Sequence, residues 1–298
     1  MDKKVVIATH DGMFHPDDIF AVATLLCLLE KTPVLTTVIR TRDEDRLRKA
    51  DFVVDVGGAH DEKNNRFDHH QAGGAGKRAN GISFAAFGLV WQKYGKDIAG
   101  SEKLAASVDQ KLVSSIDAGD NGIDIYKKNF DDVEPYLVGD FFHNLRPTWQ
   151  ESIDSLDTKF LEAVAIARQI LTREIEHSRG SLEAEKLVIA AYESSKDKRV
   201  VVLDAFYPHQ KTLGGFSEPL FVVHPRPDGK WNVGAIRDDE ASFKNRKNLP
   251  EAWAGKRDAE LASVTGVPDA VFCHNGRFMA VAQSKAGAIK LAELALSS

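Results

Sequence analysis

The sequence VVIATHDGMFHPDD, residues 5–18, joins an apolar stretch to a polar turn and then to the start of a helix. Residues 5–8 are short, apolar and rich in β-branched side chains, which is typical of a buried strand. Pro16 is a residue favoured in the first helical turn, and the apolar residues over 17–30 have helical length. A strand that leads through a short loop into a helix is the repeating unit of parallel α/β sheets.

The same alternation continues along the chain, so we predict an α/β fold with a largely parallel sheet in its first part. A catalytic domain with a connector helix is expected over 1–180, and a smaller α/β, substrate-binding domain over 181–298. Strands are expected over 34–39, 52–56 and 200–203, with hairpins over 221–236 and 269–282, the latter around Asn275-Gly276. Helices are expected over 43–50, 101–116, 154–179, 182–193 and 286–296, with a loop over 117–122.

Bulk properties narrow the class of protein. The chain has 298 residues, is 43% hydrophobic and carries a net charge of -5, so charge alone does not indicate nucleic-acid binding. Cys27 and Cys273 are too few and too far apart for a disulfide framework or a zinc site. The first strand begins too early for a signal peptide, and the longest apolar run, 19–29, is too short to cross a membrane. We therefore expect a cytoplasmic protein that does not bind membranes.

Four segments are each expected to place His or Asp at a boundary between a strand and a loop. They are His10-Asp11-Gly12-Met13-Phe14-His15-Pro16-Asp17-Asp18, Asp55-Val56-Gly57-Gly58, Phe67-Asp68-His69-His70 and Asp117-Ala118-Gly119-Asp120-Asn121-Gly122. Ligand sites in parallel α/β sheets lie beyond the carboxyl ends of the strands, so these segments are expected to meet. Imidazole and carboxylate ligands together suit Mn, Zn, Fe or Co. The pattern therefore predicts a two-metal site, with Asp55 as the bridging ligand because it leaves the middle of the sheet.

Plainer interpretations exist for single residues. Asp17 and Asp18 also suit the N-terminus of a helix, where carboxylates are favourable. Asp117 or Asp120 would also stabilise a turn through its own side chain. The coincidence of four such segments in one domain favours the metal site.

These blocks, in this order, resemble the DHH phosphoesterase superfamily, which includes RecJ-type exonucleases and family II inorganic pyrophosphatases. The Asp68-His69-His70 triplet matches the motif that names the superfamily. A closer resemblance is to the Myg (melanocyte-proliferating-gene) family of DHH-like hydrolases, whose characterised eukaryotic members are described as 3′–5′ RNA exonucleases. Its blocks are matched by residues 9–15, 39–43, 54–58, 67–71, 117–122, 145–149 and 253–255, so the resemblance covers nearly the whole chain.

The resemblance implies a role for each residue of the first domain. His10 would bind the first metal and Asp17 the second, Asp55 would bridge them, and His15 and His69 would be further ligands. Asp117 or Asp120 would complete the set. Asp68 and His70 are the expected catalytic residues: His70 would contact the substrate phosphate, and Asp68 would either orient the histidine pair or bind metal directly. His15 stands where most superfamily members have an aspartate, which favours a softer metal than Mg.

Two divalent ions, Mn²⁺ with Mg²⁺, Co²⁺ or Zn²⁺ as alternatives, are the implied cofactors. The implied activity is 3′–5′ exonucleolytic hydrolysis of short single-stranded RNA or DNA, and a homodimer is one expectation from the superfamily. The alternatives are hydrolysis of a small phosphate ester and a non-catalytic metal- or nucleotide-binding protein. Further candidates for substrate binding are Arg40, Arg42, Arg237, His274, Arg277 and Ser284. The basic residues over 40–49 would alternatively form a solvated face, Ser284 would cap the last helix, and His274 and Arg277 would belong to a solvated hairpin.

Overall fold

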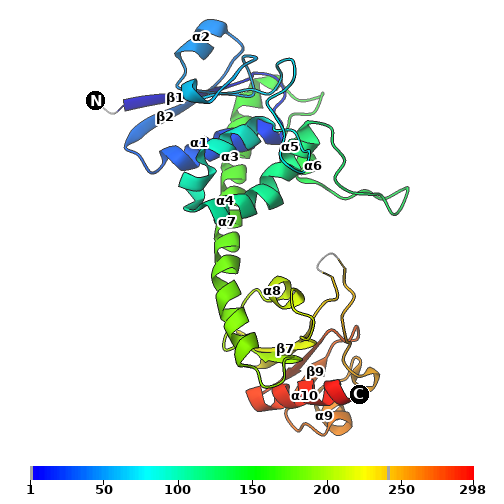
Figure 1. Ribbon diagram of the computed structural model, residues 1–298. Helices are drawn as coiled ribbons and strands as arrows, with labels where there is room; N and C mark the ends of the chain where they lie inside the picture. Colours follow the sequence, from blue (N-terminus) through cyan, green and yellow to red (C-terminus); the bar gives the residue numbers. More distant parts are fainter. Residues whose placement is uncertain (1–2, 240–241) are drawn as a thin grey trace. The chain divides into compact units, whose positions relative to one another are not determined.

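The computed structural model describes residues 3–239 and 242–298, and the chain divides into two compact units. The first unit runs to Arg179 and the second covers Gly180–Ser298. Each unit contains its own five-stranded sheet with helices packed on it (Figure 1). The predicted α/β class is therefore confirmed. Within the described residues, no helix has the combination of length and apolar composition that crossing a bilayer requires.

The sheet of the first unit has the strand order β2-β1-β3-β5-β4. Its strands are β1 (Lys3–Thr9), β2 (Val34–Arg40), β3 (Phe52–Val54), β4 (His60–Asp61) and β5 (Arg66–Phe67). β1, β2, β3 and β5 run parallel, and only β4 pairs antiparallel. The predicted parallel sheet is thus confirmed, and β3 is its central strand. The two short strands β4 and β5 carry too few residues for a periodic signal and were not predicted.

Helices cover both faces of this sheet. Helices α1 and α3 pack against each other beneath it, and the short helix α2 lies on the opposite side (Figure 1). The helical elements of this unit are α1 (Pro16–Leu29), α2 (Glu44–Lys49), η1 (Glu62–Asn64), α3 (Ala86–Ala99), α4 (Glu102–Val108), the π-helical turn η2 (Asp109–Val113), α5 (Ser114–Asp120), α6 (Val138–His143) and η3 (Ile153–Ser155).

Two helix boundaries differ from the prediction. The loop expected over 117–122 begins later, because α5 extends to Asp120 and its end is followed by Gly122 in the left-handed conformation. Two helices expected over 154–179 and 182–193 form one helix, α7 (Leu156–Ser194). Gly180 lies inside it: a glycine costs a helix only about 1 kcal/mol relative to alanine. Good helix-forming residues on both sides outweigh that cost.

The second unit has the strand order β6-β7-β8-β10-β9, with β6 and β7 parallel and the other pairs antiparallel. Its elements are β6 (Val200–Val202), α8 (Gln210–Gly214), β7 (Phe221–Pro225), β8 (Trp231–Ala235), η4 (Glu251–Trp253), α9 (Asp258–Thr265), β9 (Ala270–Cys273), β10 (Met279–Ala282) and α10 (Lys285–Ser297). Both predicted hairpins are confirmed. In the second hairpin the left-handed residue is Arg277, with φ 56°, rather than Gly276.

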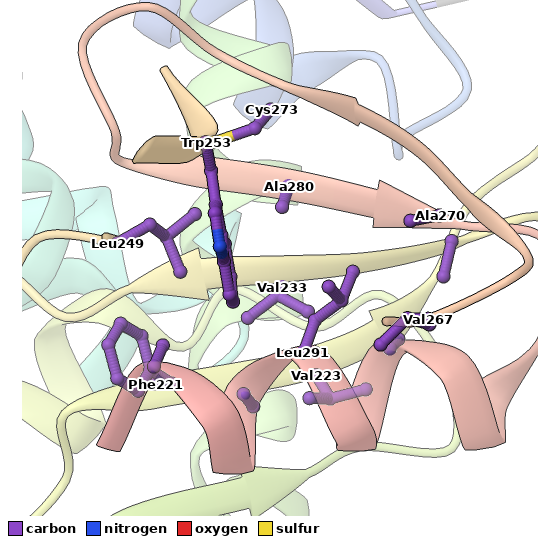
Figure 2. Packing of buried hydrophobic residues seen from close by; sticks show 14 of the residues in the cluster. Phe221, Val223, Val233, Leu249, Trp253, Val267, Ala270, Cys273, Ala280 and Leu291 are labelled. Atoms are coloured by element: carbon purple, nitrogen blue, oxygen red, sulfur yellow. The ribbon is translucent and has the colours of Figure 1, made fainter. Parts of the chain in front are cut away.

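The core of the second unit lies between one face of this sheet and α10. Figure 2 shows Leu291 of α10 facing Val223 and Val233 of the sheet, with the Trp253 indole closing the cluster. Phe221 and Cys273 are fully buried in the same cluster, so Cys273 acts as a small core residue.

Candidate metal centre

Three parallel strands of the first unit bring the segments that contain His and Asp to one edge of the sheet. His10 follows the end of β1, Asp55 follows β3, and Asp68-His69-His70 follow β5. Because these strands are parallel and adjacent, their carboxyl ends lie side by side, and the side chains that follow them converge.

Asp55 lies at the centre of the cluster and is 2% exposed. One carboxylate oxygen lies 3.4 Å from Nε2 of His10 and 3.2 Å from Nε2 of His15, and the other lies 3.3 Å from Nε2 of His69. The backbone of Asp55 has φ 58°, a left-handed conformation that costs a non-glycine residue free energy. The amide of Asp55 donates to the Phe67 carbonyl at 3.0 Å, which helps to hold this conformation.

Two groups of ligand atoms share Asp55. His10, His15 and Asp55 bring one atom each within 4.8 Å of one another. Asp55 also forms such a group with His69 and His70. A further group contains Asp17, His69 and Asp120; Nε2 of His69 is 3.8 Å from Asp17 and 3.2 Å from Asp120. Each of these groups can hold a metal ion.

The buried polar atoms of the cluster fit a cation. In the described part of the chain, the buried side-chain atoms without a well-aligned hydrogen-bond partner include both ring nitrogens of His10, both oxygens of Asp55 and Nε2 of His69. A buried polar group with no partner costs about 1–3 kcal/mol of stability. Several such atoms gathered at one point therefore fit a bound cation that all of them contact. Imidazole and carboxylate together are the ligands that Mn²⁺, Zn²⁺ or Co²⁺ accept.

The shifted pKa values of the histidines and aspartates in this cluster also indicate that it fits a cation. Burial disfavours the charged form of His15, but its bonds to Asp120 and Asp55 outweigh burial and raise its pKa to about 11. In the same way, Asp120 and Asp55 outweigh burial and raise the pKa of His69 to about 10. Burial and the nearby Asp55 and Asp120 carboxylates raise the pKa of Asp17 well above its usual value. Bound protons thus reduce the repulsion between the buried carboxylates of this cluster, and a divalent cation would reduce the same repulsion if it replaced those protons.

Asp17 has two roles in the structure. It is completely buried near the start of α1, and its two oxygens accept hydrogen bonds from the amides of Ala86 and Phe87, at 2.8 and 2.7 Å. These amides begin α3, so Asp17 caps that helix and also faces His69. The helix-terminus interpretation and the metal-site interpretation of Asp17 therefore both have structural counterparts, although the helix is α3 rather than α1.

Asp68 orients the segment that follows it. One of its oxygens accepts from the amides of His69 and His70, at 2.8 and 3.1 Å, and lies 2.7 Å from Nδ1 of His70. The other accepts from the Gly58 amide at 2.5 Å. With Nδ1 held by Asp68, the His70 ring, whose side chain is 60% exposed, presents its other edge outward.

Asp117 and Asp120 lie in different surroundings, although both belong to α5. Asp120 reaches Nδ1 of His15 at 3.0 Å and Nε2 of His69 at 3.2 Å. Asp117 is fully buried away from these histidines: it accepts from the Gly88 amide at 3.0 Å and pairs with Nη1 of Arg78 at 2.6 Å. The structure thus brings Asp120, and not Asp117, to the histidines.

The two arginine candidates of this unit also differ. The side chain of Arg40 is 3% exposed; it pairs with Asp157 at 2.8 Å, donates to the Gly12 carbonyl, and lies over the Phe160 ring. These contacts tie the loop after β1 to α7, so Arg40 supports the fold. Arg42 is 63% exposed, and its Nε lies 3.3 Å from Asp11.

Of the candidates in the second unit, His274 and Arg277 lie at one end of the β9–β10 hairpin, near the end of β8, and Ser284 lies at the other end. His274 and Arg277 belong to the loop between the strands, where the Gly276 amide donates to Nδ1 of His274 at 2.9 Å. Ser284 follows β10 and caps α10: its Oγ accepts from the Gly287 amide at 3.0 Å and donates to Asp269 at 2.6 Å. Arg237 follows β8, and its guanidinium lies over the Phe243 ring. These four residues do not form one cluster.

Three residues near the centre were missed as site residues by the sequence analysis. One Asp18 oxygen lies 3.2 Å from Nε2 of His10 and has no hydrogen bond, while the other accepts from the His15 amide. Arg78 neutralises the buried Asp117, and it comes from a polar loop without a recognisable motif. Arg146 lies over Phe14, and burial lowers its pKa. Two signals were available: Asp18 stands next to Asp17 in the first motif, and Arg146 lies in the matched block 145–149.

Comparison with known proteins places the chain in a family. The MYG1_exonuc model, described as an uncharacterised protein family (UPF0160), matches residues 6–296. The MYG1 protein C694.04c of Schizosaccharomyces pombe is 32% identical, with 99% of this chain and 98% of that protein covered. The MYG1 protein of Dictyostelium discoideum is 29% identical, with 97% and 95% covered, and the human MYG1 exonuclease is 28% identical, with 98% and 85% covered.

Among solved structures, RecJ from Thermus thermophilus in complex with Mn²⁺ aligns with a TM-score of 0.29 and 12% identity, covering 98% of this chain and 52% of the RecJ chain. The resemblance to the Myg family drawn from the sequence motifs is confirmed by the family match and by the full-length relatives. Since the match extends over nearly all of its residues, this chain belongs to the MYG1 family.

Proposed function

We propose that this protein is a two-metal phosphoesterase that removes nucleotides from an end of short single-stranded RNA or DNA, in the 3′–5′ direction. The observation that carries the proposal is that Asp55, at the carboxyl edge of a parallel sheet, contacts His10 and His15 with one oxygen and His69 with the other, while His69 also forms a ligand group with Asp17 and Asp120. The name exonuclease, which the human, bovine and rodent relatives carry, supports the choice of reaction.

In this proposal His10, His15 and Asp55 would hold one ion, and Asp17, His69 and Asp120, together with Asp55, would hold the other. Asp18 lies beside the first group and adds negative charge to it. Two divalent ions at this position would polarise a phosphate and lower the pKa of a water nucleophile. The imidazole-rich ligand set favours Mn²⁺ over Mg²⁺.

His70 is the side chain proposed to contact the phosphate. Asp68 holds its Nδ1 at 2.7 Å, which fixes the ring and leaves Nε2 for a substrate oxygen. With Nδ1–H donated to Asp68, the protonated imidazolium would donate from Nε2, and that hydrogen bond would strengthen as negative charge grows on the phosphoryl oxygens in the transition state. Asp68 is a positioning residue in this account, because its oxygens are already occupied by amides and by His70.

The test is cleavage of end-labelled RNA and DNA oligomers by the purified protein with Mn²⁺, with Mg²⁺ and with a chelator. A His69→Ala variant removes a proposed ligand, and His60→Ala, on the neighbouring strand β4 beside Phe67, is the matched control. We expect metal-dependent shortening from the 3′ end in the wild type and in the control, and its loss in His69→Ala.

Other outcomes have definite meanings. Shortening from the 5′ end would reverse the proposed polarity. Hydrolysis of nucleotides, dinucleotides or pyrophosphate without attack on longer oligomers would establish the small-ester alternative. Stoichiometric metal binding with no turnover of any of these substrates would refute the enzymatic proposal.

A further inference from the structure

The first-unit sheet is covered unequally on its two faces. Alternate residues of a strand point to opposite faces, and Phe52 packs on the α3 side, against Tyr94. Its neighbour Val53 therefore faces the α2 side, in a cluster with Ala8, Leu47, Ala50 and Val56. Helix α2 has only six residues, which is too short to cover all five strands on this face.

A cavity of about 580 Å³ lies on this incompletely covered face. Its volume is within the range of about 300–1,000 Å³ that small-molecule sites occupy. Leu47, Val53 and Val56 provide apolar lining, and basic residues provide most of the charged lining. The complete lining consists of Arg42, Glu44, Leu47, Arg48, Val53, Val56, Gly57, Ala59 and Arg66.

The cavity begins next to the metal centre. Gly57 lies two residues after Asp55, and a Cβ on Gly57 would stand 3.9 Å from side-chain carbons of both Leu47 and Val53. The backbone after Asp55 thus forms part of the wall between the cavity and the metal centre. In the loop after β1, a Cβ on Gly12 would stand 3.4 Å from Nδ1 of His10 and 3.7 Å from Nη2 of Arg42. Arg42, which lines the cavity, and His10, a proposed metal ligand, therefore both lie beside Gly12.

The arginines of the cavity can exchange their present partners for an anion. Arg66 donates to the carbonyls of Ala50 and Asn65, at 3.0 and 3.4 Å, and forms no carboxylate ion pair within the described ranges. Arg48 pairs with Glu44 and Asp45 on an exposed helix surface, and Arg42 pairs with the exposed Asp11. Exposed ion pairs contribute little free energy, so a phosphate can displace them. Arginine also binds phosphate through two parallel N–H donors.

We propose that this cavity binds the nucleoside next to the scissile phosphate. The base would contact the apolar lining. The outer phosphate, which is the terminal phosphate on the far side of that nucleoside, would contact Arg48 and Arg66. The inference rests on the proposed function and specifies its substrate: the smallest efficient substrate is a dinucleotide with an outer phosphate. Apolar contact and arginine stacking do not distinguish the four bases, so the cavity accepts any of them.

The first test compares two substrates of the Mn²⁺-loaded protein. A dinucleotide with a terminal phosphate fills the cavity, whereas bis(p-nitrophenyl) phosphate is a diester with no nucleoside. Arg48→Ala removes a phosphate contact, and Ala59→Phe fills the cavity from its rim. Arg46→Ala, on the same helix but outside the lining, is the matched control. We expect the ratio of kcat/KM for the dinucleotide to that for the simple diester to fall at least tenfold in both test variants and to stay within twofold in the control.

A second test measures binding without turnover, by calorimetry with a dinucleotide whose linkage is an unreactive methylphosphonate. We expect a Kd at least tenfold higher in Arg48→Ala and Ala59→Phe, and unchanged in Arg46→Ala. An equal loss for both substrates, or wild-type binding in both test variants, would overturn the cavity assignment. If the wild type hydrolyses neither substrate, the proposed function fails, while the binding result still decides the cavity. Thermal unfolding of each variant verifies that it is folded.

Discussion

Replacement of the two aspartates of α5 separates metal binding from stability. Asp117→Ala leaves Arg78 and the Gly88 amide without their buried partner. Removing one member of a buried ion pair costs about 3–5 kcal/mol, and we expect the lower value, about 3 kcal/mol, because Arg78 keeps Asp109 at 2.7 Å. For a unit of this size each kcal/mol lowers Tm by about 2–4 °C, so Tm should fall by about 6–12 °C.

Asp120→Ala should behave in the opposite way. Its side chain is 16% exposed, and its ion pairs among the described residues are with His15 and His69. Both histidines keep Asp55 as a partner, so the metal-free protein should lose less stability than in Asp117→Ala. If Asp120 is a metal ligand, Mn²⁺ affinity should fall by more than the about 10–100-fold seen when an outer partner of a ligand is removed. The Mn²⁺ affinity of Asp117→Ala should stay within about threefold of the wild type, since Asp117 does not touch the histidines.

The assay is calorimetric unfolding in chelator together with Mn²⁺ titration of each variant, at a pH near 7.5 and at a temperature where both variants are folded. At this pH the Asp117 carboxyl is ionised, because burial outweighs Arg78 and raises its pKa only to about 6. The reasoning is refuted if Asp117→Ala loses Mn²⁺ affinity and keeps its Tm while Asp120→Ala binds Mn²⁺ like the wild type.

Three further predictions follow from the same geometry. Asp55→Asn removes the charge shared by the ligand groups, so bound Mn²⁺ should fall below one ion per chain and turnover by at least about 1,000-fold; metal analysis showing two ions would contradict this. The folded-state pKa values of His15 and His69, about 11 and about 10, exceed the unfolded value of about 6.5, so their stabilisation of the metal-free protein is complete below pH 6.5 and is lost as pH rises toward 10–11. The Tm difference between Mn²⁺-loaded and chelator-treated protein should therefore widen from pH 7 to pH 9, and a constant or narrowing difference would show that metal does not replace these protons. Gly180→Ala, at an exposed position where a Cβ meets no atom within 4 Å, should stabilise α7 by about 0.5–1 kcal/mol in chemical denaturation, whereas an unchanged or lower stability would argue against a continuous helix there.

The sequence by itself determined the elements that surround the metal centre. Apolar β-branched runs ended by His or Asp predicted β1 and β3, and parallel strands place such residues at one edge whatever the details of packing. His10, His15, Asp55 and His69 could therefore be chosen without coordinates. Motif order along the chain also led to the family, because it depends on residue identity and spacing alone.

Only the tertiary structure decided between residues that the sequence treats alike. Asp117 and Asp120 are three positions apart in one motif, and their partners, Arg78 on one side and the histidines on the other, come from distant segments. Arg40 and Arg42 are two positions apart, yet one is enclosed by Asp157 and Phe160 of α7 while the other remains exposed at the cavity. Local propensity and periodicity describe a residue's own element, whereas burial and charge pairing depend on which distant element packs against it. That dependence is why the sequence left these assignments open and packing resolved the surroundings of each residue.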